Sequence, residues 1–224
     1  MKHFSLIDLA ISVSEKHEGD VRSLEGILKI APTVNDLHAL QHLRLAHGSD
    51  VVIALPTPEN REHAGDALLT NKDYLALSMV VGDCLPIVLY DSESGVTALI
   101  HGGWRSLHAN ILEKTLQKAQ KELGLQIKTT KAWIGPGIRE CCYDTKIAPT
   151  QLADHEWKAH ILHEENCWTV DLAGFVRVQL QRLGVKSIDD TKICTSCGTG
   201  YFSHHRAMQT SETDGRFAVV VKRT

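Results

Sequence analysis

Two short apolar runs joined by a turn constrain this chain more than any other feature of its sequence. Residues 86–91 (PIVLYD) and 96–101 (VTALIH) flank the tetrapeptide SESG, whose polar residues and glycine are typical of a turn. The pattern predicts an antiparallel hairpin, and a hairpin brings its two outer ends together. Because Cys84 precedes the first strand and His101 ends the second, we expect these two side chains to be close neighbours at one edge of a sheet.

Further strands and helices are expected around this hairpin. The strand-like runs are rich in Val, Ile and Leu and bounded by turn residues, and they cover 51–55, 66–70, 75–81, 131–135 and 217–222. Apolar residues recur at helical spacing over 105–123 and 171–183, with a glycine after each helix, and a third helix is expected over 149–160. The sequence predicts an α/β (α+β) fold, a mixed β-sheet flanked by helices in one domain over residues 1–224.

Length, charge and cysteine usage exclude several function classes. The 224 residues fit one domain, with no repeat or low-complexity linker to divide them. A formal net charge of -3 gives no basic surface for nucleic acid, and no apolar run approaches the roughly 20 residues of a membrane span. Residues 1–20 lack a signal-peptide pattern, and a chain of this length needs no disulfides. We therefore expect a cytoplasmic protein without a nucleic-acid or membrane partner.

A cysteine beside a histidine supports two kinds of chemistry. The imidazole can activate the thiol as a nucleophile, or both side chains can bind a metal. Asp83 before the cysteine and Gly102-Gly103 after the histidine indicate a polar corner with close backbone approach. His47 lies before a glycine just ahead of the strand at 51–55 and is a candidate third ligand, since three protein ligands with an open position are typical of catalytic zinc.

The motifs around this corner resemble the YfiH-like family, long labelled polyphenol oxidase or laccase-like. Its members are now described as purine nucleoside phosphorylases with adenosine deaminase and methylthioadenosine phosphorylase activity. The resemblance covers roughly residues 43–221 and is carried by DALLTN, GDCLPIVLYD, VTALIHGGWRS, WIGPGIRECCYDT, DLAGFVRVQLQRLGV, CTSCGTGYFSHHR and GRFAVVV. It implies a YfiH-like sandwich related to the cysteine-hydrolase fold.

The resemblance also implies a metal site. In the family, zinc is held by the histidine of Q-V-H-G, the cysteine of A-D-C and the first histidine of H-A-G-W-R-G, which fall on His47, Cys84 and His101. It therefore implies Zn²⁺ as the cofactor, Cu²⁺ as an adventitious occupant, and purine nucleosides and phosphate as substrates. The motifs here read L-A-H-G, G-D-C and H-G-G-W-R-S, and the upstream asparagine-arginine pair of the family has no counterpart in VNDLHAL (residues 34–40).

Five more residues are candidates for the reaction. In deamination a zinc-activated water attacks C6 of adenine, and Asp83, or else Asp66, could shuttle the proton. In phosphorolysis phosphate attacks the anomeric carbon, so the site needs cations. Arg105 at a helix start is expected to bind phosphate, and Arg206 and His205 in YFSHHR are expected to contact substrate.

Three other functions remain open. The chain could be a metal-free cysteine hydrolase or deamidase with Cys84 as nucleophile and His101 as base, a copper-dependent polyphenol oxidase, or a binding protein without activity. A substitution of His47 would distinguish the cysteine hydrolase from a zinc enzyme. His47→Ala should remove metal and activity together in a zinc enzyme, whereas a cysteine–histidine dyad should tolerate it.

Four of the remaining cysteines form two short motifs. Cys141 and Cys142 are expected to pack as apolar residues, because adjacent cysteines rarely bind one metal together. The pair Cys194-x-x-Cys197 has the spacing of a structural metal site or a redox pair. A single such pair is weak without a second one, so an ordinary packing role is expected for it.

Overall fold

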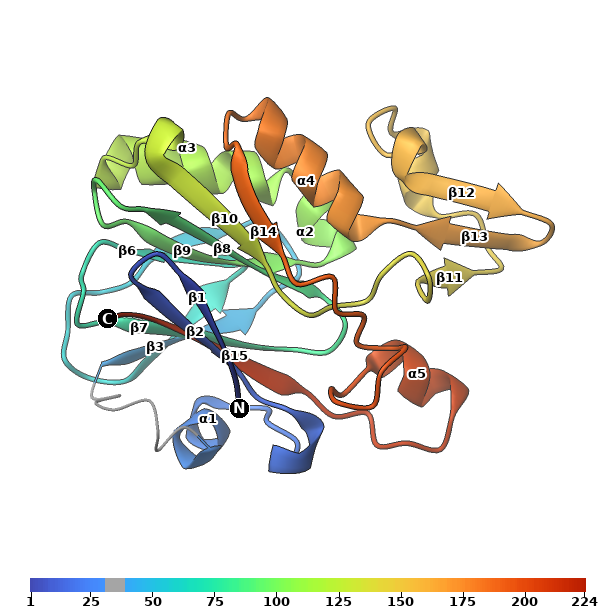
Figure 1. The fold of residues 1–224 in the computed structure, drawn as a ribbon, viewed down its shortest axis with the longest axis horizontal. Helices are drawn as coiled ribbons and strands as arrows, with labels where there is room; N and C mark the ends of the chain where they lie inside the picture. The colour runs from blue at the N-terminus through green and yellow to red at the C-terminus, as the bar shows by residue number, and fades with distance from the viewer. Residues whose placement is uncertain (31–38) are drawn as a thin grey trace.

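Two six-stranded sheets form the centre of the protein (Figure 1), which we describe from a computed structural model for residues 1–30 and 39–224. The first sheet has the strand order β1-β2-β15-β7-β3-β5, with strands at Lys2–Leu6 (β1), Leu9–Val13 (β2), Leu40–Leu45 (β3), Arg61–Gly65 (β5), Ala76–Val81 (β7) and Phe217–Arg223 (β15). The second has the order β14-β10-β8-β9-β6-β4, with strands at Val51–Ile53 (β4), Ala67–Thr70 (β6), Leu85–Asp91 (β8), Thr97–Gly102 (β9), Thr130–Ile134 (β10) and Ser187–Asp190 (β14). A small third sheet joins Asp144–Thr145 (β11), Ile161–Glu164 (β12) and Cys167–Val170 (β13).

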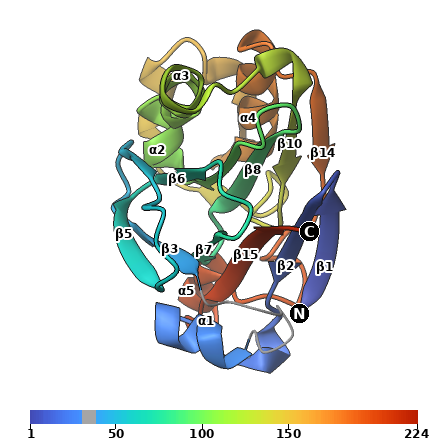
Figure 2. The same cartoon turned by 90° about the vertical axis from the view of Figure 1, so that its left-hand side faces the viewer.

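Helices cover the outer faces of the two sheets (Figure 2). They span Leu24–Ile30 (α1), Trp104–His108 (α2), Ile111–Leu123 (α3), Leu172–Arg182 (α4) and His204–Gln209 (α5), with 3₁₀ turns at Lys16–Glu18, Ile127–Thr129, Thr150–Ala153 and Lys158–His160. α3 and α4 pack on the second sheet, and α1 packs on the first. A third apolar layer, which includes Met79, Val88 and Phe217, lies between the two sheets. The α/β class is confirmed, and the expected mixed sheet is a pair of packed mixed sheets.

The predicted hairpin is confirmed. β8 and β9 pair antiparallel with Pro86 opposite His101, and every residue of both strands is buried. Burial on both faces explains why the two strands read as continuous apolar runs instead of alternating. At the closed end of the hairpin, the Asp91 carboxylate accepts hydrogen bonds from Thr129 Oγ1 at 2.6 Å and the Gln126 backbone N–H at 2.8 Å.

The strand nearest the C-terminus, β15, occupies an internal position in the first sheet. β15 lies between β2 and β7 and is antiparallel to both, so that Val219 is opposite Val13 on one side and Met79 on the other. Its valines alternate between the inter-sheet layer and the layer under α1, and both positions are buried. Strand prediction succeeded here because both faces of β15 are covered.

The helices depart from prediction at two places. The helix expected over 105–123 is broken at Asn110, which adopts a left-handed conformation with φ 61°, so α2 and α3 are separate. The helix expected over 149–160 is wrong. Two 3₁₀ turns occupy this segment, and between them Asp154 Oδ1 accepts a hydrogen bond from the Glu156 backbone N–H, which favours a turn over a continued helix. The helix expected over 171–183 is confirmed as α4. The Asp171 side chain caps its start by accepting a hydrogen bond from the Gly174 backbone N–H.

Within residues 1–30 and 39–224, no helix is both long and apolar enough to cross a membrane. Most of the segment VNDLHAL lies outside the described residues.

Candidate active site

Three predicted ligands meet at the open end of the hairpin. His101 is fully buried at the end of β9, and Cys84 is half-buried directly before β8. The rings of His47 and His101 lie 4.9 Å apart between centroids, at an angle of 78°. His47 reaches this position from the turn after β3, where it adopts a left-handed conformation with φ 59°. The expected proximity of Cys84 and His101 is confirmed, and His47 joins them.

A buried carboxylate fixes the orientation of His101. The Asp66 Oδ1 atom lies 3.1 Å from Nδ1 of the ring, and the Ser106 hydroxyl lies 3.3 Å from both atoms. Asp66 Oδ2 accepts a hydrogen bond of 2.8 Å from the Gly48 backbone N–H, which ties the His47 turn to the same carboxylate. Nδ1 therefore carries a proton and donates to Asp66, which leaves Nε2 as the ring atom that faces Cys84. A carboxylate behind a histidine is the arrangement typical of metal-binding histidines.

The donor chemistry at this corner suits a metal ion, although among the described residues only Cys141, Cys142, Cys194 and Cys197 bring all their ligand atoms within 4.8 Å of one another. A metal site at His47, Cys84 and His101 stays a prediction. Nε2 of His101 is buried and has no hydrogen-bond partner among the described residues. A Cβ atom on Gly103 would lie 2.9 Å from this nitrogen and 3.2 Å from Cys84 Sγ, so only glycine leaves the space between the two groups open. A buried, unpaired nitrogen facing a thiol is costly unless a ligand satisfies it. The thiolate and imidazole donors are those that zinc prefers.

The electrostatics favour positive charge here. Burial alone would lower the pKa of His101, but charge on Cys84 and the hydrogen bond to Asp66 raise it to about 9. Burial would likewise raise the pKa of Asp66, yet His101 and the backbone N–H groups of the His47 turn hold it below its ordinary value. The corner therefore carries a carboxylate and a group that retains a proton, and a metal cation would replace that proton.

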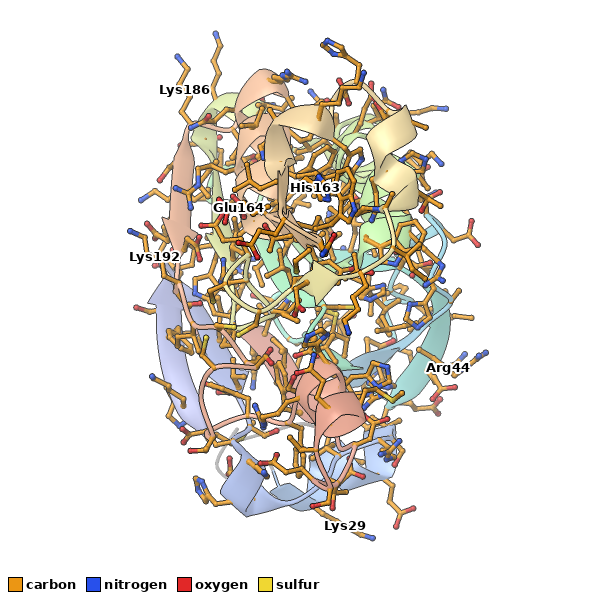
Figure 3. The ribbon with its side chains drawn as sticks, turned by 90° about the vertical axis from the view of Figure 1, so that its right-hand side faces the viewer. Lys29, Arg44, His163, Glu164, Lys186 and Lys192 are labelled. Carbon is orange, nitrogen blue, oxygen red and sulfur yellow. The ribbon has the colours of Figure 1, made fainter. Side chains whose placement is uncertain are left out.

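A cavity of about 740 Å³ opens beside the three ligands. Its volume falls in the range of small-molecule sites. Arginines on four segments line it: Arg22 before α1, Arg44 at the end of β3, Arg105 at the start of α2 and Arg216 just before β15. Glu62 also lines the cavity and accepts a hydrogen bond of 2.8 Å from Arg44. Figure 3 looks onto α5 and shows Arg44 at the rim of this face. Tyr143 also lines the cavity, and burial raises its pKa to about 12, so the phenol keeps its proton.

The predicted carboxylate Asp83 lines the cavity but is already occupied by hydrogen bonds. It accepts them from Thr195 Oγ1 at 2.6 Å, from Ser203 Oγ at 3.0 Å and from the His205 backbone N–H at 2.7 Å. Asp83 therefore holds the segment that begins α5 next to Cys84. A role in proton transfer stays a prediction for Asp83.

The other predicted residues divide between the cavity and its supporting structure. Arg105 and His205 line the cavity; the Arg105 guanidinium lies 4.4 Å from the Trp104 ring centroid, and His205 Nε2 lies 3.0 Å from Asp144 Oδ1. Arg206 lies outside the lining. Its guanidinium donates to the carbonyl oxygens of Thr195, Ser196, Gly198 and Tyr201 and to the Glu212 carboxylate. A substrate contact stays a prediction for Arg206.

Sequence reasoning missed Arg44, Arg216 and Tyr143. Arg44 stands three residues before His47 on the strand leading to it, and Arg216 opens the motif GRFAVVV. Tyr143 follows the cysteine pair in the motif CCYDT. Each lies in or next to a motif already singled out, so their position in the motifs was the available signal.

Four cysteines gather in the loops that follow β10 and β14. Cys142 packs against the hydrophobic core as predicted, whereas Cys141 is exposed, and both lie next to the pair Cys194 and Cys197. The sulfur atoms of Cys141 and Cys142 lie 3.3 and 3.2 Å from that of Cys197, and with Cys194 all four lie within 4.8 Å of one another. The group could hold a metal ion. Burial alone would raise the pKa of Cys194, but backbone N–H groups of Cys197, Arg139 and Ser196 hold it below its ordinary value.

Two packed mixed sheets with a histidine–cysteine corner above a cationic cavity define a YfiH-like α/β protein. The model of the family described as multi-copper polyphenol oxidoreductase laccase matches residues 2–224, and the chain belongs to this family. The family resemblance predicted from the motifs is confirmed.

Relatives and solved structures agree with this assignment. The chain is 30% identical over 164 residues to a purine nucleoside phosphorylase of Clostridium acetobutylicum, covering 71% of this chain and 67% of that protein. It is 30% identical over 182 residues to one of Streptomyces coelicolor, covering 77% and 70%. YlmD of Geobacillus stearothermophilus has the same fold, with a TM-score of 0.82 and 22% identity over 97% of this chain and 92% of that one. The hypothetical protein YfiH of Bacillus licheniformis also has this fold, with a TM-score of 0.80 and 20% identity. The match covers 96% of this chain and 93% of that one.

Proposed function

We propose that the protein is a zinc-dependent purine nucleoside phosphorylase that acts in the cavity beside His47, Cys84 and His101. The observation that carries the proposal is the buried His101 ring, which Asp66 orients so that an unpaired Nε2 faces Cys84 next to the cavity. Two relatives at 30% identity bear the name of this activity. The free state of all six cysteines supports a reducing, cytoplasmic location.

The cavity residues suit binding of phosphate and a nucleoside. The lining arginines supply guanidinium groups, whose planar forks match phosphate oxygens. Arg44 is paired with Glu62 and Arg216 with Asp214, so Arg105 is the first candidate to bind phosphate. In phosphorolysis a phosphate oxygen forms a bond to the anomeric carbon as the glycosidic C–N bond breaks. The electron pair of that bond leaves with the purine, which takes up a proton. The arginines would hold the attacking phosphate, and the protonated Tyr143 would donate a hydrogen bond to the bound nucleoside.

His47, Cys84 and His101 would hold the zinc ion. When bound, zinc supplies a positive charge that polarises a neighbouring oxygen or lowers the pKa of a water molecule. The chain itself fixes the ligand geometry: Asp66 orients the His101 ring, and the Gly48 N–H on the same carboxylate sets the position of the His47 turn. We extend the proposal to phosphorolysis of methylthioadenosine and deamination of adenosine, which the family resemblance implies for the same cavity.

Chromatography of adenosine incubated with zinc-loaded protein, with and without phosphate, tests the proposal. Adenine and ribose 1-phosphate that appear only with phosphate would support phosphorolysis, and inosine would support deamination. If adenosine, inosine, guanosine and methylthioadenosine all persist under both conditions, the proposed function is wrong. His47→Ala separates the alternatives, because a metal-free cysteine hydrolase would keep its activity in this variant. Oxidation of phenols by zinc-loaded, copper-free protein would be needed to favour an oxidase.

A further inference from the structure

We propose that Cys141, Cys142, Cys194 and Cys197 form a second, purely structural zinc site. This inference does not depend on the proposed reaction. The four sulfur atoms lie within 4.8 Å of one another, and Cys197 Sγ lies 3.3 Å from Cys141 Sγ and 3.2 Å from Cys142 Sγ. A tetrahedral zinc ion with bonds of about 2.3 Å places its sulfur ligands about 3.8 Å apart. The separations of 3.2 and 3.3 Å are shorter than this value and every other pair lies within 4.8 Å, so small side-chain movements would close the cluster around an ion.

The strand arrangement brings the two cysteine pairs together. β10 and β14 are parallel neighbours, so the loops that follow them leave the same edge of the second sheet. These loops remain paired beyond the strands: the Gly137 N–H donates to Ile193 O at 3.2 Å, and the Thr195 N–H donates to Gly137 O at 3.1 Å. The two cysteine pairs therefore lie on two loops whose backbones are hydrogen-bonded to each other.

The geometry favours a metal over a disulfide. All four thiols are free, and the sulfur separations exceed the roughly 2.05 Å of a disulfide bond. Cys197 lies at nearly the same distance from two different partners, whereas a disulfide would use one and leave the other unpaired. Four thiolates fill every position of a tetrahedral ion, and such closed sites are structural. Cys141 and Cys197 are exposed, so an ion can reach the cluster from solvent.

The cluster is connected to the cavity. The Arg206 guanidinium donates hydrogen bonds to the carbonyl oxygens of Thr195, Ser196 and Gly198. These bonds fix the conformation of the loop between Cys194 and α5. Within that loop the Thr195 hydroxyl donates to Asp83, the residue before Cys84. A zinc ion in the cluster would therefore fix the loop that holds Asp83 in place.

Metal analysis of four proteins tests the inference: the wild type, Cys84→Ala, the double variant Cys194→Ala/Cys197→Ala, and Cys167→Ala as a control for loss of a thiol elsewhere. We expect the double variant to bind one zinc equivalent fewer than the wild type, and Cys84→Ala and Cys167→Ala to retain that equivalent. This difference is expected even if no metal binds at Cys84, which separates the inference from the proposed function. Zinc content unchanged in a folded double variant, or iron in place of zinc, would overturn it.

Cobalt substitution gives a readout that does not require the double variant to fold. Cobalt bound by four thiolates absorbs strongly in the visible range, and we expect this spectrum in both the wild type and Cys84→Ala. A spectrum with at most one thiolate ligand would contradict the assignment. So would thiol titration of anaerobically purified protein that finds a disulfide among the four cysteines.

Discussion

The corner at Cys84 and the four-cysteine cluster are assembled in opposite ways. In the first, one hairpin brings a cysteine and a histidine together, a buried carboxylate orients the ring, and a cavity of about 740 Å³ opens beside them. In the second, sulfur atoms 56 residues apart meet through loops, and all four lie within 4.8 Å of one another at the surface. An incomplete ligand set next to a cavity leaves room for substrate, whereas a complete one can only hold the chain together.

The largest expected effect separates the two clusters by activity. Cys84→Ala should lower kcat/KM for phosphorolysis by well over about 100-fold, because even residues behind a metal ligand commonly cost about 10- to 100-fold. Cys194→Ala/Cys197→Ala should mainly lower the Tm. Phosphorolysis assays and thermal unfolding of both proteins check this. Equal losses of activity in the two variants would contradict the assignment of a catalytic role to the Cys84 corner and a structural role to the four-cysteine cluster.

Asp66→Asn should have the next largest effect. The amide can still contact Nδ1 of His101, but it removes the negative charge that stabilises the ring orientation. We expect zinc affinity and kcat/KM to fall by about 10- to 100-fold. Competition with a coloured chelator measures the affinity. Wild-type affinity in this variant would show that Asp66 serves packing alone.

Gly103→Ala should have a smaller effect on the same corner. The new Cβ would lie 2.8 Å from His101 Cε1 and 3.2 Å from Cys84 Sγ, so the backbone or the ring must shift. We expect about 1–3 kcal/mol lower stability to unfolding, as for other overpacked sites, with about tenfold weaker zinc binding. Gly200→Ala is the control, since its nearest neighbour would be 3.9 Å away. Similar behaviour of the two variants would argue that the space at Gly103 is unimportant.

Asp91→Asn should change stability without changing activity, because Asp91 lies at the far end of the hairpin. Burial raises the pKa of Asp91, but hydrogen bonds from Ser94, Thr129 and the Gln126 backbone hold it below its ordinary value. Such a carboxylate stabilises the fold above its unfolded pKa of about 3.9, and this contribution disappears as pH falls through the lower folded pKa. We expect about 1–3 kcal/mol of destabilisation near neutral pH.

Urea unfolding of the wild type and Asp91→Asn at about pH 7 and about pH 3 tests this sign. The difference between the two proteins should shrink at the lower pH. A difference that grows on acidification would contradict it. Activity reduced more than about twofold at neutral pH would show that the two ends of the hairpin are coupled.

The sequence predicted most strands of the second sheet but only β7 and β15 of the first, where the inner strands β2 and β3 were missed along with the edge strands. β8, β9 and β15 are covered on both faces and appear as apolar runs. β1 and β5 were missed, because polar residues such as Lys2 and Glu62 occupy their exposed positions. The break at Asn110 has no apolar signature either, since the helical spacing of buried residues continues across it.

The candidate site was predictable where one hairpin builds it. Cys84 and His101 follow from turn chemistry, and His47 follows from its position just ahead of the strand at 51–55 together with the family resemblance. The four-cysteine cluster could not be found in this way. Its proximity depends on β10 and β14 being parallel neighbours, and β14 carries polar residues such as Asp189 and Asp190 that hid it as a strand. The rule against adjacent cysteines as ligands concerns sequence alone and ignores how the loop turns.

The central position of β15 has a consequence for synthesis of the protein. Until residues 217–223 leave the ribosome, β2 and β7 present two facing edges with unpaired backbone groups, which are templates for aggregation. The second sheet needs nothing beyond Asp190 and can be complete earlier. The nascent chain therefore exposes an incomplete first sheet next to a complete second sheet. A stop codon placed before β15 would leave an aggregation-prone intermediate instead of a slightly shortened folded protein.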